Sequence, residues 1–168
     1  MKKIIYALLI VLFVIVLASC AKADAEPVAG MINPGDKIGD FLITTGEEGN
    51  VTYSWDLGCE QQGDEEVYSC ESAVNTKVNV SVGIYDDQHS GRLEEIWAGH
   101  TYELFIEDRP VNLEAFGTID TTHPAVGKMR HWNVVVVANK PGEITIRDSG
   151  VVDGDSFEEV SVYTFSAP

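Results

Sequence analysis

The stretch Val78–Ile84, with the sequence VNVSVGI, decides the fold class of this chain. Every second residue in it is apolar, and polar or small residues lie between. Successive side chains of a strand point to opposite faces, so this period of two predicts a strand with one buried face. A helix would place its apolar residues three or four positions apart.

The same alternation continues on both sides of this stretch. It predicts strands at Val51–Leu57 and Thr101–Ile106. The run Val134–Val137 is apolar on both faces, which is typical of a central strand covered on both sides. Further strands are expected at Ile38–Thr45, Val67–Glu71, Val111–Ala115, Glu143–Arg147 and Val160–Phe165.

Helical periodicity is confined to one short segment. Leu93, Ile96 and Trp97 share a face, so Leu93–Ala98 is expected to be a helix that ends at Gly99. Many short strands with turn signals every ten or so residues predict an all-β fold, a single β-sandwich. The turn sequence at residues 33–36, Asn-Pro-Gly-Asp, opens the domain, which we place at residues 34–168.

The N-terminus has the composition of an export signal. Lys2 and Lys3 precede an apolar run from Ile4 to Leu17, which is short for a membrane span. The sequence Leu17-Ala18-Ser19-Cys20 that follows resembles the lipobox of bacterial lipoproteins. The resemblance implies cleavage after residue 19, a diacylglyceryl group on the Cys20 thiol, and a flexible tether over residues 20–33. The alternative is a single uncleaved transmembrane anchor.

The resemblance also implies a location. A lipoprotein of this kind is extracytoplasmic and lipid-anchored to the cell membrane or the outer membrane. In bacteria with two membranes, the neutral Ala21 after the lipidated cysteine favours the outer membrane. Two acyl chains make such anchoring stable, whereas one chain gives marginal binding.

A second resemblance concerns the folded domain. A strand, a tight turn and a strand at Glu103–Val111 are followed later by Trp132–Val135 and Pro141–Ile146. This texture is similar to immunoglobulin-like sandwiches of secreted bacterial proteins. It covers about a third of the chain and implies a fold, not a function.

The charge excludes one class of partner. The chain has 27 acidic residues against 11 Lys and Arg, and loss of two lysines with the signal takes the net charge from −16 to −18. Nucleic-acid binding needs clustered basic residues, so no nucleic-acid partner is expected. Solubility explains the acidity, and an acidic face for cations or for a basic partner is the alternative.

Two cysteines remain once Cys20 carries lipid. Cys59 and Cys70 flank a polar loop, and an even pair outside the cytoplasm predicts a disulfide bond. Metal binding by these two thiolates is the alternative, but no Cys-x-x-Cys or histidine partner lies near them.

Catalytic motifs are not found in the sequence: it has no nucleophile elbow, no His-Glu-x-x-His and no phosphate-binding loop. We therefore expect no enzyme and no cofactor. His123 and His131, together with Asp120, could form a zinc or copper site. Lys128 and Arg130 lie between the two histidines in the sequence and would repel a dication. We therefore expect His123 and His131 to be surface or turn residues.

Calcium is the better candidate metal. Asp153, Asp155 and Glu158 supply oxygen ligands around Gly154, although the spacing is not that of an EF-hand, and solvated loop acids are the alternative.

Aromatic side chains offer a platform for a ligand. The alternation places Tyr53 and Trp55 on the core face, and Trp132 precedes the buried valines. Tyr85 and Trp97, near Asp86 and Asp87, are therefore the candidate ligand-binding residues.

These observations predict a membrane-anchored extracytoplasmic lipoprotein that acts as a non-catalytic binding or assembly module. Its expected partners are the membrane, through the diacylglyceryl anchor, and either a carbohydrate or an envelope protein. The alternative is a cell-envelope hydrolase that acts on glycans. An enzyme would show converging carboxylates or histidines with perturbed pKa values in a cleft. A scaffold subunit would show a large exposed apolar patch.

Overall fold

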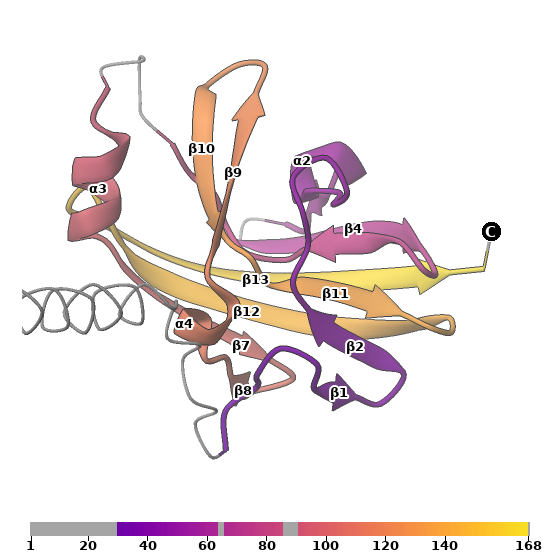
Figure 1. The fold of residues 1–168 in the computed structure, drawn as a ribbon. Coiled ribbons are helices and arrows are strands. Elements are labelled where there is room, and N and C mark those ends of the chain that lie inside the picture. The colour runs from indigo at the N-terminus through magenta and orange to yellow at the C-terminus, as the bar shows by residue number, and fades with distance from the viewer. Residues whose placement is uncertain (1–29, 64–65, 86–90, 168) are drawn as a thin grey trace, which may run out of the picture.

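The expected all-β, sandwich-like fold is confirmed. A computed structural model describes residues 30–63, 66–85 and 91–167, whose strands form three sheets with short helices between them (Figure 1). The predicted signal peptide, the lipobox and Cys20 lie outside the described residues. No helix in the described ranges is long and apolar enough to cross a membrane.

The two larger sheets are the layers of the sandwich. The first has the order β1–β2–β11–β5 and the second the order β3–β4–β13–β12–β7–β8. The strands of the first sheet are β1 (Lys37–Ile38), β2 (Phe41–Thr44), β11 (Val135–Ala138) and β5 (Lys77–Asn79). The strands of the second are β3 (Glu60–Gln61), β4 (Val67–Ala73), β13 (Asp155–Ser166), β12 (Gly142–Val152), β7 (Thr101–Ile106) and β8 (Arg109–Pro110).

The pairing in the second sheet is mostly antiparallel. β12 and β13 form its long central hairpin, and β4 runs parallel to β13 on the far side. The third sheet, β6–β10–β9, stands out from one end of the sandwich in Figure 1. Its strands are β6 (Ile84–Tyr85), β9 (Thr118–His123) and β10 (Gly127–Trp132).

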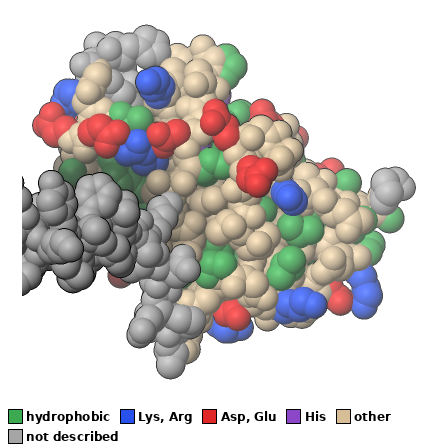
Figure 2. All heavy atoms as spheres, viewed as in Figure 1, with side chains coloured by type: hydrophobic (Ala, Val, Ile, Leu, Met, Phe, Trp, Pro, Cys, Tyr) green, Lys and Arg blue, Asp and Glu red, His purple; other side chains and the backbone are tan. Residues whose placement is uncertain are grey.

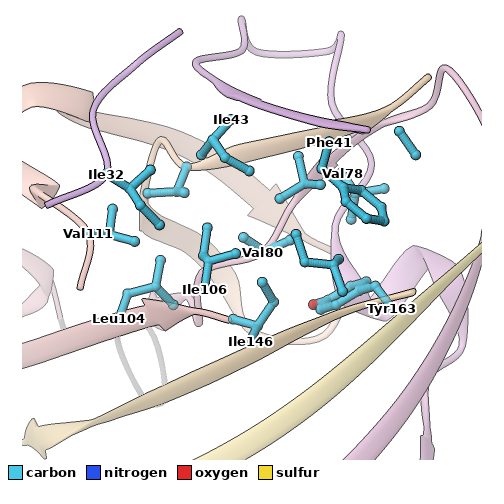
Figure 3. Packing of buried hydrophobic residues seen from close by; sticks show 14 of the residues in the cluster. Ile32, Phe41, Ile43, Val78, Val80, Leu104, Ile106, Val111, Ile146 and Tyr163 are labelled. Atoms are coloured by element: carbon cyan, nitrogen blue, oxygen red, sulfur yellow. The ribbon is translucent and has the colours of Figure 1, made fainter. Parts of the chain in front are cut away.

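The core lies between the two larger sheets. Figure 3 shows side chains of both layers meeting, such as Val78 from β5 and Ile146 from β12. The expected central position of the valine run is confirmed, because β11 lies between β2 and β5, and Val135 and Val136 are fully buried. Burial on both faces explains why this strand is apolar throughout.

Residues just before the predicted start of the domain at residue 34 contact the core. Ile32, which we assigned to the tether, is completely buried and forms a bridge to Val111. The Ile32 N–H donates to the Pro110 carbonyl, and the Asn112 N–H donates to the Ile32 carbonyl. The chain therefore joins the core before the Asn33–Asp36 turn.

Two of the predicted strands are helical instead. Residues 51–57 do not form a strand, because α2 occupies Ser54–Leu57. The Asp56 carboxylate accepts a hydrogen bond from the Tyr53 N–H, and Gly58 ends the helix at φ 64°. The Asp56 bond satisfies a backbone donor at the start of the helix, and the left-handed Gly58 ends it, so local capping overrides the alternation.

The prediction for Val111–Ala115 fails in the same way. α4 occupies Leu113–Phe116 and buries Phe116. In contrast, the predicted helix is confirmed as α3 (Leu93–Gly99), with Ile96 as its buried residue.

The predicted disulfide between Cys59 and Cys70 is confirmed. The two Cα atoms are 4.3 Å apart, and the bond closes the hairpin formed by β3 and β4. Cys70 is buried in the core, so the bond ties this edge of the second sheet to the interior.

Candidate ligand-binding site

The C-terminal end of α3 places Trp97 and His100 side by side. Their ring centroids are 4.3 Å apart, and His100 Nδ1 bonds to the Trp97 carbonyl. A carbonyl oxygen only accepts, so Nδ1 carries the proton of this hydrogen bond. Both side chains are partly buried.

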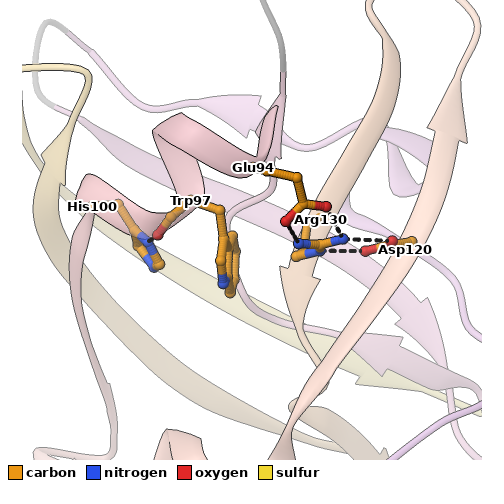
Figure 4. Close-up of polar contacts among 5 residues, drawn as sticks. All are labelled: Glu94, Trp97, His100, Asp120 and Arg130. Atoms are coloured by element: carbon orange, nitrogen blue, oxygen red, sulfur yellow. Dashed lines mark hydrogen bonds and ion pairs between the residues drawn. The ribbon is translucent and has the colours of Figure 1, made fainter. Parts of the chain in front are cut away.

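A charged clamp holds α3 against the β9–β10 hairpin (Figure 4). The Arg130 guanidinium donates to both Glu94 oxygens at 2.8 and 2.9 Å and to both Asp120 oxygens at 2.6 and 2.9 Å. These hydrogen bonds raise the pKa of Arg130 and lower the pKa values of Glu94 and Asp120. Bidentate pairing fixes orientation as well as distance, so α3 is held in one position.

Trp97 is packed on several sides. Arg130 Cζ lies 5.7 Å from the centroid of its ring, within cation–π distance. The Trp132 ring centroid is 5.3 Å from it. The indole nitrogen of Trp132 is buried and has no hydrogen-bond partner within the described part of the chain. The rings of Trp97, His100 and Trp132 contact one another, and we call these three side chains the aromatic wall.

A cavity of about 690 Å³ opens beside the aromatic wall, between α3, β7 and α4. Figure 2 shows a recessed hydrophobic area directly below the acidic side chains around α3. Tyr102, Glu103 and Glu114 also line it, and none of its lining residues in the described ranges is Lys or Arg. The volume is in the range of small-molecule sites.

The other side of α3 faces a second cavity of about 450 Å³. Tyr85, with 44% of its surface exposed, lies there with Ile96 and Phe157. The structure thus separates the two predicted ligand-binding aromatics: Trp97 lines the larger cavity and Tyr85 the smaller one. Asp86 and Asp87 lie outside the described residues.

Tyr102 lines both cavities, and its hydroxyl contacts the buried carboxylate of Asp148. Its hydroxyl donates to Asp148 Oδ2 at 3.0 Å and accepts from the Val82 N–H at 3.0 Å. Asp148 is 2% exposed, and burial raises its pKa to about 7. Burial also raises the pKa of Glu159, which is opposite Asp148 on β13.

This pair was missed in the sequence, although a signal is present. Ile144 and Ile146 point inward from β12, so the alternation places the next inward side chain at Asp148. Glu103, Glu114 and His100 were missed because they meet at the cavity only through the packing of β7 and α4 against the end of α3.

Among the described residues, His123, His131 and Asp120 are not placed to hold a metal ion. The segment from His123 to His131 is a hairpin and not a loop: His123 pairs with Gly127 near its turn, whereas His131 pairs with Ile119 near its base. Both imidazoles contact the Trp55 ring, with centroids 5.2 and 5.3 Å away. The expectation of surface histidines is wrong for His131, which is 1% exposed and whose pKa burial lowers to about 4.

The predicted calcium ligands are not gathered around one point. Within the described ranges, no three His, Cys, Asp or Glu residues are placed to hold a metal ion. Asp153 and Gly154 form the two-residue turn between β12 and β13, both at positive φ, as a hairpin turn requires. Arg92 bonds to Asp153 at 3.2 Å. Glu158 is further along β13, opposite Ser149.

Comparison with protein-family models, with curated proteins and with solved structures found no match to this chain.

Proposed function

We propose that this protein is a lipid-anchored, extracytoplasmic binding module without catalytic activity, whose ligand is a carbohydrate of the cell envelope. The signal at residues 1–19 is removed, Cys20 carries the diacylglyceryl group, and the following residues tether the sandwich to the cell membrane or the outer membrane. The acidic domain is repelled by anionic headgroups over about a Debye length, so it faces away from the membrane surface.

The cavity beside the aromatic wall carries this proposal. Trp97 and Trp132 supply aromatic surface for the apolar face of a sugar ring, while Glu103 and Glu114 supply acceptors for its hydroxyl groups. Few convergent polar groups on a mainly apolar lining are typical of small-ligand sites.

A protein partner is less well supported. Among the described residues, the large hydrophobic side chains that remain exposed are Tyr85 and Val151, which are single positions and not an extended patch. A concave site suits a small or chain-like ligand better than the flat surface of another domain.

Substitution of the aromatic wall tests the carbohydrate site. With the full chain in detergent, Trp97→Ala should weaken binding to a glycan identified on an array by about tenfold, because the stacking surface is lost. Tyr85→Ala, which removes an aromatic ring at the second cavity, is the matched control and should leave the affinity unchanged. If only Tyr85→Ala weakens binding, the site has been assigned to the wrong side of α3.

Mass spectrometry of the mature protein tests the anchor. The expected result is a chain that begins at Cys20, with the mass of a diacylglyceryl group on it. Recovery of the chain with an unmodified Met1 would contradict both cleavage and lipidation.

A glycan hydrolase is the second candidate, favoured by the raised pKa values of the buried Asp148 and the partly buried Glu159. Against it, Asp148 is 2% exposed, its Oδ2 accepts from Tyr102, and it lines none of the three described cavities beside α3. Turnover of an oligosaccharide that Asp148→Asn abolishes would support the hydrolase over the binding module.

A further inference from the structure

The charged side chains that line the larger cavity are carboxylates. Glu103 and Glu114 line it as exposed carboxylates. His100 Nδ1 donates to the Trp97 carbonyl, so this donor is not available to a ligand. A cavity with this set of groups pairs with a ligand that presents hydrogen-bond donors.

Two guanidinium groups lie against aromatic rings of the lining, Arg130 against Trp97 and Arg147 against Phe105, with Cζ 5.7 and 4.3 Å from the ring centroids, and neither arginine is itself a lining residue. Arg130 lies behind Trp97, and its donors are engaged by Glu94 and Asp120. It is not among the lining residues, so it provides no direct contact for an anionic group there.

The aromatic side chains of the cavity also favour a positively charged ligand. The faces of Trp and Tyr rings carry partial negative charge and attract a cation within about 6 Å. Trp97, Trp132 and Tyr102 surround the cavity that Glu103 and Glu114 border. The net charge of −16 adds a long-range attraction for cations and a repulsion for acidic ligands.

From these contacts we infer that the ligand carries a protonated amine on a sugar-sized body, as an amino sugar with a free amine does. The inference rests on the proposed function and narrows its ligand class. The ammonium group lies between the two carboxylates and the aromatic faces, and the sugar ring packs on the aromatic wall. Acidic sugars are excluded by repulsion from the same two carboxylates.

Isothermal titration of the full chain in detergent compares four trisaccharides near pH 6. They are trimers of glucosamine, N-acetylglucosamine, glucose and galacturonic acid, and spermidine supplies amines without a sugar ring. The glucosamine trimer should bind about tenfold more tightly than its N-acetylated form, because acetylation removes the charge that the carboxylates pair with. The galacturonic acid trimer should bind weakest.

Variants assign this preference to the cavity. The double variant Glu103→Gln/Glu114→Gln should reduce the preference for the glucosamine trimer to about threefold or less, as expected when two charge pairs are lost. Glu143→Gln/Glu158→Gln removes the same charge from exposed positions of β12 and β13 and should retain the preference.

The outcomes separate the inference from the proposed function. Equal binding of the glucosamine and N-acetylglucosamine trimers, or tightest binding of the acidic trimer, overturns the inference and retains a carbohydrate site. Loss of the preference in the control variant also overturns the inference, since bulk charge then explains it. Binding of spermidine but of no trisaccharide would support recognition of an amine and contradict the proposal of a carbohydrate ligand.

Discussion

At the scale of the residue, Asp148 occupies an inward-facing position of β12, where the alternation of the strand predicts an apolar side chain. Its folded-state pKa of about 7 lies above the ordinary aspartate value of 3.8, so the folded protein binds this proton more tightly than the unfolded chain. The stability that the proton supplies is complete below about pH 4 and is lost as the pH rises through 7. In urea unfolding, the free energy should fall by up to about 4 kcal/mol over this range on account of Asp148.

Asp148→Asn should remove this part of the pH dependence, because the amide resembles the protonated acid and does not ionise. Asp155→Asn, which removes an exposed carboxylate from β13, is the control and should keep the wild-type profile. A profile for Asp148→Asn as steep as that of the wild type would show that this carboxyl is not the buried titrating group.

At the scale of the element, the position of α3 depends on Arg130. The helix has seven residues and one buried side chain, Ile96, so packing alone holds it weakly. Arg130→Lys keeps the charge but loses the planar fork that engages both carboxylates. Amide hydrogen exchange in α3 should become at least about fivefold faster, while exchange in β12 and β13 stays unchanged.

The exposed ion pair between Lys140 and Asp40 provides the comparison. Lys140 Nζ lies 3.1 Å from Asp40 Oδ1, and both side chains are more than half exposed. Lys140→Gln should leave the exchange rates within error, since exposed pairs contribute little. Unchanged exchange in Arg130→Lys would contradict the clamp.

At the scale of the whole molecule, the disulfide links the β3–β4 edge of the second sheet to the core. It spans 11 residues of sequence, so removal should lower the free energy of unfolding by about 2–3 kcal/mol, chiefly by freeing the unfolded chain. The test is guanidinium unfolding of Cys59→Ala/Cys70→Ala with and without reductant. The wild type should lose stability in reductant, and the double variant should not respond. A double variant as stable as the oxidised protein would mean that the bond contributes nothing.

Much of the sandwich could be predicted because its strands alternate clearly. β11, β12 and the end of β13 have Val, Ile or Phe at their inward positions. The prediction of one strand with one buried face at Val78–Ile84 is wrong, because β5 ends at Asn79, β6 begins at Ile84, and the polar Asn79 and Ser81 are buried as well. The β9–β10 hairpin was missed because Thr121, His123 and His131 occupy its inner face, where hydrophobic residues are expected. α2 was missed because its caps, and not its periodicity, determine its conformation.

The sequence by itself determined the all-β class and the Cys59–Cys70 bond, since strand periodicity and the proximity of two cysteines in the chain are local properties. Only the tertiary structure decided which side chains share a cavity and which carboxylate is buried. Trp97, Glu114 and Trp132 come from α3, α4 and β10, and Asp148 meets Tyr102 across two paired strands. Such contacts depend on how the sheets and helices pack, which no single stretch of sequence encodes.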